Sequence, residues 1–206
     1  ESAASRPERH NLAEVRAGEY EGLSGRSGDG HWTPDFGPDT FNAKSGATAI
    51  GARPFLIAYN INLNTRNTKK AMKIAALIRE KGIIRREAGE IVRDLEGNAV
   101  RTPGVFKGVK GIGWYIEEYG RCQVSLNVTD FEVSPMHEVL EETRRIALNE
   151  GVIVTGSELV GLVPRRALTW AGHFYLEKEG ANPGVSEREL VDTAIHSLGL
   201  RDVGEF

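Results

Sequence analysis

The side chains best suited to chemistry are neutral amides and hydroxyls that alternate along two strand-like stretches. Asn60 and Asn62 share one face of the first stretch, and one face of the second carries Gln123, Ser125 and Asn127. Amide groups both donate and accept hydrogen bonds, which suits recognition of a polar heterocycle or an amino-acid backbone. The alternative is an ordinary solvated sheet face, because such faces have no fixed composition.

A second candidate is the loop-like stretch from Pro34 to Arg53, which leads into the first of those strands. Its glycines and prolines argue against a regular helix or strand, and such a loop keeps backbone donors and acceptors available at a surface. Phe36 and Phe41 would be poorly placed in a purely solvated spacer. Composition alone favours an inter-domain linker, and a loop that cradles a ligand is the alternative.

The remaining reactive side chains form no recognisable catalytic or metal-binding motif. The single cysteine, Cys122, excludes an internal disulfide and a cysteine zinc cluster, and it suits a reducing cytosol. No histidine, cysteine and aspartate have the spacing of metal ligands, so we expect no bound metal. His137 and His196 fall in amphipathic helical patterns, which indicates structural histidines, and the same is expected of His173 beside an inward-facing phenylalanine.

The overall composition is that of a globular protein, with 40% hydrophobic and 27% charged residues. A net charge of -3 and a pI near 6.0 argue against a generic nucleic-acid binder. No apolar run is long enough to cross a bilayer, and no signal peptide opens the chain. We therefore expect a cytoplasmic protein without a nucleic-acid or membrane partner. The chain begins at Glu1, which suggests a truncated or processed protein.

Hydrophobic periodicity predicts the elements that position these residues. From Phe55 the predicted order is β-α-β-β-α-β, followed by two further helices. The strands are 55–63, 109–117, 121–128 and 152–163, and the helices are 67–81, 134–150, one from 164 and one from 186 to about 198. This order predicts an α/β (α+β) fold of the ferredoxin-like split βαβ type, an antiparallel sheet with helices on one face.

Local signals define several boundaries. Asn11 is expected to cap one short helix in the polar segment 1–33, and Ser134 to cap the helix that continues with proline. Ser186 and Glu189 form a capping box for the last helix. The charged segment 85–103 is expected to be a solvent-facing hairpin with no recognisable chemistry.

Nine segments carry a resemblance to one protein family, in order, from about residue 16 to the C-terminus. They are RAGEYE at 16–21, PDFGP at 34–38, GAT at 46–48, IGAR at 50–53, IAYNINL at 57–63, IGWY at 112–115, QVS at 123–125, Asp130 and GSELVGLVP at 156–164. Each segment alone is a weak signal, whereas the ordered combination is specific. The chain resembles the glutamate formimidoyltransferase (formiminotransferase) family.

The resemblance implies an organisation and an activity. Residues 1–53 would be the end of the N-terminal formiminotransferase subdomain with a connecting loop, and residues 54–206 the C-terminal subdomain. Proteins of this family transfer the formimino group of N-formimino-L-glutamate to tetrahydrofolate in histidine degradation, and they are commonly homodimers. Tetrahydrofolate is the implied co-substrate, and the resemblance implies no metal.

The resemblance also implies site residues. The folate-contacting segment of the family matches the loop, where glycine allows close approach and Phe41 offers a surface to the pteridine ring. The implied folate-binding residues are Gly37, Pro38, Asp39, Thr40, Phe41, Asn42, Ala43, Lys44, Ser45 and Gly46. Cations that suit the anionic glutamyl tail are Lys44, Arg53, Lys107 and Lys110. The resemblance implies a substrate-facing role for Glu158, at a position where some members carry glutamine. The alternation along the strands adds Asn60, Gln123, Ser125 and Asn127 as substrate-facing candidates.

One feature of the family is missing. Its general base is a histidine in a Gly-Glu-His-Pro-Arg-like motif, and none of the five histidines, at 10, 31, 137, 173 and 196, has those neighbours. We therefore expect no catalytic residue in this chain and little or no activity of the chain alone. The alternatives are a non-catalytic folate-binding protein of the same fold, a ferredoxin-like protein-interaction module, and a formyltetrahydrofolate cyclo-ligase, for which the usual ATP loop is not visible.

Overall fold

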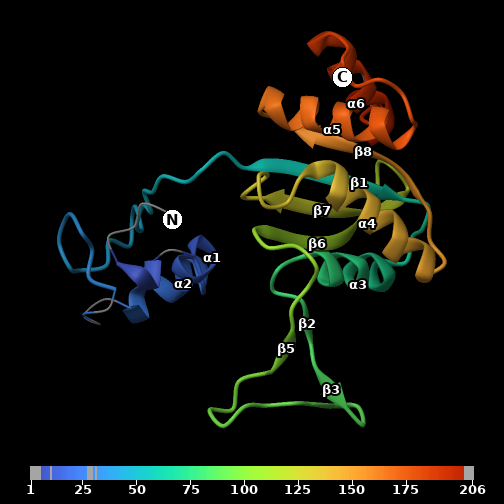
Figure 1. Cartoon of the computed structure of the whole chain (residues 1–206). Coiled ribbons are helices and arrows are strands. Elements are labelled where there is room, and N and C mark those ends of the chain that lie inside the picture. The colour runs from blue at the N-terminus through green and yellow to red at the C-terminus, as the bar shows by residue number, and fades with distance from the viewer. Residues whose placement is uncertain (1–5, 10, 27–29, 31, 202–206) are drawn as a thin grey trace. The chain divides into compact units, whose positions relative to one another are not determined.

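The computed structural model describes residues 6–9, 11–26, 30 and 32–201. The chain divides into two compact units, Glu1–Pro54 and Phe55–Phe206, and each has its own secondary structure (Figure 1). No helix in the described part of the chain is long and apolar enough to cross a membrane.

The second unit is built on a four-stranded antiparallel sheet in the order β6-β7-β1-β8. Its strands are β1 (Ile57–Leu63), β6 (Val109–Ile116), β7 (Arg121–Val128) and β8 (Val154–Val160). With α3 (Thr68–Ile78) after β1 and α4 (Met136–Asn149) after β7, the chain order is β-α-β-β-α-β. The predicted α+β fold with an antiparallel sheet is confirmed.

One face of the sheet is apolar and forms the core of the unit. Along β1 the side chains of Ile57, Tyr59, Ile61 and Leu63 are fully buried, as their alternation in the sequence requires. They join apolar side chains of both helices in one cluster, which includes Ile74, Ile78, Val139, Leu140 and Ile146. The opposite face of the sheet therefore carries the even-numbered residues of β1.

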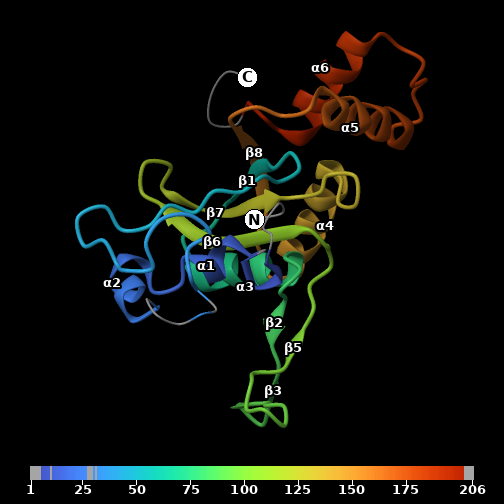
Figure 2. The same cartoon turned by 90° about the vertical axis from the view of Figure 1, so that its left-hand side faces the viewer.

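Two further helices, α5 (Arg165–Lys178) and α6 (Glu187–Leu198), lie beyond β8 in both views (Figures 1 and 2). The capping box is present, because the Ser186 hydroxyl accepts from the Glu189 backbone while the Glu189 carboxylate accepts from Ser186. The helices approach each other closely at Gly172. A Cβ there would lie 2.1 Å from the backbone oxygen of Leu190, so only glycine fits without movement.

The charged segment between α3 and β6 forms an arm that extends away from the sheet (Figures 1 and 2). Its base pairs β2 (Ile83–Ile84) with β5 (Arg101–Thr102), and its outer part pairs β3 (Arg86–Glu87) with β4 (Glu90–Ile91). The expected hairpin is confirmed, with Leu95 fully exposed in its turn.

Two helix boundaries differ from the sequence-based expectation. Helix α3 ends at Ile78 rather than residue 81, because the backbone of Glu80 instead donates to Val109 on β6 at 2.9 Å. Helix α4 is not capped by the side chain of Ser134, whose hydroxyl donates to the carbonyl oxygen of Lys107 at 2.6 Å. In both places a tertiary hydrogen bond replaces the local one.

The first unit contains four short helical elements, η1 (Pro7–Arg9), α1 (Leu12–Val15), α2 (Glu19–Leu23) and η2 (Ser24–Arg26). Asn11 caps α1 as expected, its side chain accepting from the backbone of Ala13. The single helix expected here is divided in two at Gly18, which adopts a left-handed conformation with φ of 79°.

Candidate functional site

The polar face of the sheet gathers amides from two strands around a carboxylate from a third. Strand pairing sets Asn60 opposite both Ser125 and Glu158, and it sets Asn62 opposite Gln123. All of these side chains point away from the helix-covered core, because neighbouring residues in register share a face. The residues that alternate along β1 and β7 thus lie on one face of the sheet, and the third strand adds Glu158 to them.

Hydrogen bonds join four of these side chains into an amide–carboxylate cluster, which comprises Asn60, Asn62, Gln123 and Glu158. The Gln123 amide nitrogen donates to Asn62 Oδ1 at 2.7 Å and to Glu158 Oε2 at 3.0 Å. The other carboxylate oxygen, Glu158 Oε1, accepts a longer bond of 3.4 Å from Asn60 Nδ2. Two neutral amides thus orient one carboxylate.

Burial gives this cluster its chemical character. Asn62 and Gln123 are fully buried, Asn60 retains 9% exposure, and Glu158 is half-buried. Among the residues that the structure describes, no arginine, lysine or histidine forms an ion pair with Glu158. A partly desolvated carboxylate without a cation is unfavourable by itself and favours a ligand that brings positive charge or N–H donors.

The other predicted residues of this face differ in accessibility. Ser125 is half-buried beside the cluster, and Asn127, one pleat further along β7, is exposed. Gln123 lies at the centre of the amide–carboxylate cluster but is fully buried. It can therefore affect a bound ligand only through the neighbouring side chains.

Sequence reasoning missed an aromatic and aliphatic edge to this face. Ile112 and Trp114 on β6 pair with Ser125 and Gln123, so their side chains lie beside the polar residues. Both are about half exposed, at 51% and 46%. Their two-residue spacing was a usable signal, because it places them on one face of a strand that pairs with β7.

The predicted folate loop lies in the first unit and is held by its own turn. The Asn42 side chain accepts from the backbone nitrogens of Lys44 and Ser45 at 3.0 and 3.1 Å. The Phe41 ring lies 5.5 Å from the Tyr20 ring, and the Tyr20 hydroxyl donates to the backbone of this turn. Gly37 and Gly46, at its two ends, both have positive φ, at 95° and 65°. The end of the loop, from Phe41 to Gly46, is therefore a turn anchored on α2.

The cations proposed for an anionic ligand tail are all exposed. They are Lys44, Arg53, Lys107 and Lys110. Arg53 donates to the carbonyl oxygen of Pro54 at 3.1 Å. Lys44 and Arg53 belong to the first unit, and the other two belong to the second.

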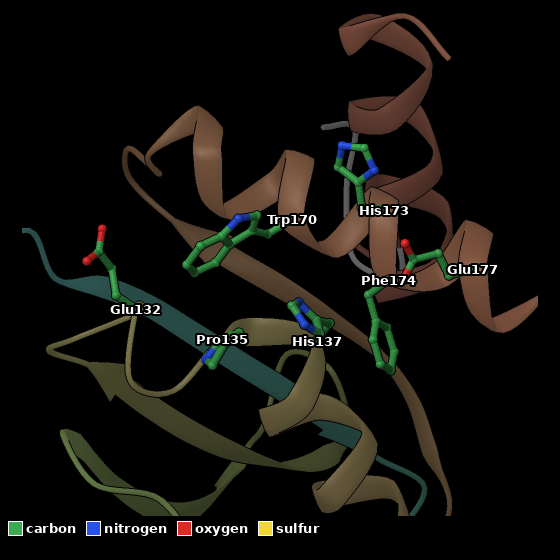
Figure 3. A pocket seen from close by; sticks show the side chains of 7 residues that line it. All are labelled: Glu132, Pro135, His137, Trp170, His173, Phe174 and Glu177. Atoms are coloured by element: carbon green, nitrogen blue, oxygen red, sulfur yellow. The ribbon is translucent and has the colours of Figure 1, made fainter. Parts of the chain in front are cut away.

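A separate hollow of about 340 Å³ lies between the start of α4 and α5 (Figure 3). It is lined by Glu132, Pro135, His137, Trp170, His173, Phe174 and Glu177. His137 is buried and stacks on Phe174 with ring centroids 4.5 Å apart. Burial lowers the pKa of His137 to about 4, against an opposing effect of Glu141, so the ring is neutral at pH 7. It shares no residue with the amide–carboxylate cluster.

Of the three histidines predicted to be structural, His137 is buried, whereas His173 and His196 are exposed. His10 and His31 lie outside the described residues. In the described ranges, no three side chains of histidine, cysteine, aspartate or glutamate are grouped as metal ligands.

Comparison with known sequences assigns the chain to a protein family. A family model described as the formiminotransferase domain matches residues 58–206, and another, described as the N-terminal subdomain of that domain, matches residues 1–53. The chain belongs to the formiminotransferase family. The polar face of the sheet, from Asn60 to Glu158, lies wholly within the first match.

Relatives that match this chain include proteins of two kinds. The formimidoyltransferase-cyclodeaminase of Mus musculus is 42% identical over 204 residues, which is 99% of this chain and 35% of that protein. The glutamate formimidoyltransferases of Streptococcus pyogenes and Thermoplasma acidophilum are 37% and 36% identical, over 87% and 93% of this chain. The chain spans 53% and 57% of their lengths.

Proposed function

We propose that the protein carrying this chain transfers the formimino group of N-formimino-L-glutamate to tetrahydrofolate. The names of its relatives describe formimidoyl transfer by those proteins, with glutamate named in two of them. The observation that supports the proposal most directly is the half-buried carboxylate of Glu158, which two amides orient and no described cation neutralises.

The chemistry of the formimino group suits that carboxylate. A formimino group is an amidine, so it carries N–H donors and becomes a cation when protonated. Charge-assisted hydrogen bonds from such a group to a carboxylate are roughly twice as strong as neutral ones. Glu158 would accept from the formimino nitrogens, while Asn60, Ser125 and Asn127 supply further polar contacts around them.

The folate half of the proposal rests on the first unit. Residues Gly37 to Gly46 would approach the pterin through their backbone, with Phe41 against the ring. Lys44, Arg53, Lys107 and Lys110 would attract the glutamyl tail. The family resemblance further suggests a cytoplasmic homodimer that acts in histidine degradation.

The proposed reaction is a single group transfer. N5 of tetrahydrofolate attacks the formimino carbon, forming a C–N bond and a tetrahedral intermediate. The intermediate then collapses, the bond to the glutamate nitrogen breaks, and that nitrogen takes up a proton. A base must accept the N5 proton, and the sequence lacks the family's histidine motif. We propose that the base lies outside these 206 residues, so that the chain alone binds ligand without turning it over.

A paired assay tests this proposal. The full-length protein should convert formiminoglutamate and tetrahydrofolate to formiminotetrahydrofolate, whereas the isolated 206-residue chain should show no transfer. Titration of the isolated chain with 5-formyltetrahydrofolate should give weak saturable binding. Normal transfer by the isolated chain would refute the assignment of the base. Binding without transfer by the full-length protein would favour the non-catalytic folate-binding alternative, and neither activity would favour an interaction module.

A further inference from the structure

Gln123, the only glutamine of the chain, is held in one orientation by its neighbours. Its amide nitrogen points at two acceptors, Asn62 Oδ1 and Glu158 Oε2. An ionised carboxylate can only accept hydrogen bonds, so the Gln123 amide must present its nitrogen to that side. The oxygen, Gln123 Oε1, consequently points away, and it is buried without a hydrogen-bond partner.

This arrangement is unfavourable for stability alone. A buried carbonyl oxygen without a donor loses its hydration and gains nothing in return. The backbone of Gln123 is already paired within the sheet, opposite Asn62 on one side and Trp114 on the other. An apolar side chain of similar length would occupy the same position without an unsatisfied oxygen. The role of the Gln123 amide is therefore to be found in the two side chains to which it donates, Asn62 and Glu158.

We propose that Gln123 is a positioning residue that fixes the carboxylate of Glu158 for the formimino group. The inference rests on the proposed function. Gln123 is fully buried and acts only through Glu158, which remains partly accessible. It binds Oε2 at 3.0 Å and leaves Oε1 with only the 3.4 Å bond from Asn60. Each carboxylate oxygen can accept two hydrogen bonds, and the longer bond at Oε1 leaves that oxygen the less satisfied of the two and the better acceptor for the substrate.

The test is a double-mutant cycle in the full-length protein. Gln123→Met keeps the length of the side chain and removes both of its polar atoms. It should lower kcat/KM for formiminoglutamate about tenfold, with the KM for tetrahydrofolate unchanged, because loss of one neutral donor misplaces the carboxylate without removing it. In a Glu158→Ala background the same change should have no further effect, since residues that act through one another are not additive.

Thermal unfolding separates positioning from a structural role. Gln123→Met should be close in stability to the unmodified protein, because removal of the buried unsatisfied oxygen offsets the loss of the donor to Asn62 Oδ1. Asn182→Asp, which alters an exposed amide far along the chain, serves as a control and should change neither activity nor stability.

Three results would overturn the inference. They are unchanged kinetics in Gln123→Met, a loss of activity that follows a loss of stability, and equal effects of the change with and without Glu158. Absence of transfer by the unmodified full-length protein would instead refute the proposed function, and it would also refute this inference, which depends on that function.

Discussion

At the scale of residues, the surroundings of a side chain decide its chemical role more than its residue type does. Glu158 and His137 are both ionisable groups of the second unit, yet their surroundings differ. The carboxylate is half-buried among amides that can donate to it. The imidazole is stacked on an aromatic ring, and burial keeps it neutral. Of these two groups, only the carboxylate can supply a negative charge to a ligand that carries N–H groups.

The buried imidazole predicts a pH dependence of stability. Burial lowers the pKa of His137 from 6.5 to about 4, so the unfolded chain binds the proton more readily between those values. The contribution of the neutral, buried His137 to the free energy of unfolding should be fully present above pH 6.5 and should fall as the pH is lowered toward 4. The loss down to pH 4.5 should be on the order of 1 kcal/mol, allowing for solvent screening.

Urea unfolding at several pH values measures this effect. The exposed His173 provides the control, because His173→Gln should leave the decline in stability unchanged, whereas His137→Gln should flatten it. Equal declines in the two variants would show that His137 does not titrate as its burial indicates.

At the scale of elements, hydrophobic periodicity was sufficient to predict the helices and strands wherever the local sequence pattern agrees with the tertiary structure. Alternation along β1 and β7 predicted both the core face and the amide face, and the capping box at Ser186 was found as expected. The errors arose at Glu80 and Ser134, where bonds to distant backbone groups decide the helix ends. The hydrogen bond from Gln123 to Glu158 was likewise not predictable, because strand order and strand register bring these two side chains together.

The contact between α5 and α6 gives a prediction at the same scale. Gly172→Ala should destabilise the protein by about 1–3 kcal/mol, because the added methyl group overlaps the α6 backbone at Leu190. Gly22→Ala is the matched control: this helical glycine of α2 has ordinary van der Waals space, so the change should be neutral or mildly stabilising. Chemical denaturation compares the two. Similar effects of both changes would mean that helix propensity rather than the close approach dominates at Gly172.

At the scale of the whole molecule, the proposed folate contacts and the proposed formimino contacts belong to different units. The loop proposed to bind folate, Gly37 to Gly46, belongs to the first unit and ends in a turn at Asn42, and the amide–carboxylate cluster belongs to the second. Composition alone described that loop as a linker. The ordered family resemblance added the folate interpretation, and the structure added the anchoring turn on α2.

The most direct test of the central claim is the steady-state kinetics of Glu158 variants in the full-length protein. Glu158→Ala should lower kcat/KM for formiminoglutamate by about 10- to 100-fold, the effect of removing a hydrogen bond to a charged group. Glu158→Gln keeps an acceptor oxygen and should lose less. The KM for tetrahydrofolate should change little in either variant. A folded Glu158→Ala protein with undiminished kcat/KM for formiminoglutamate would contradict the claim that this carboxylate receives the formimino group.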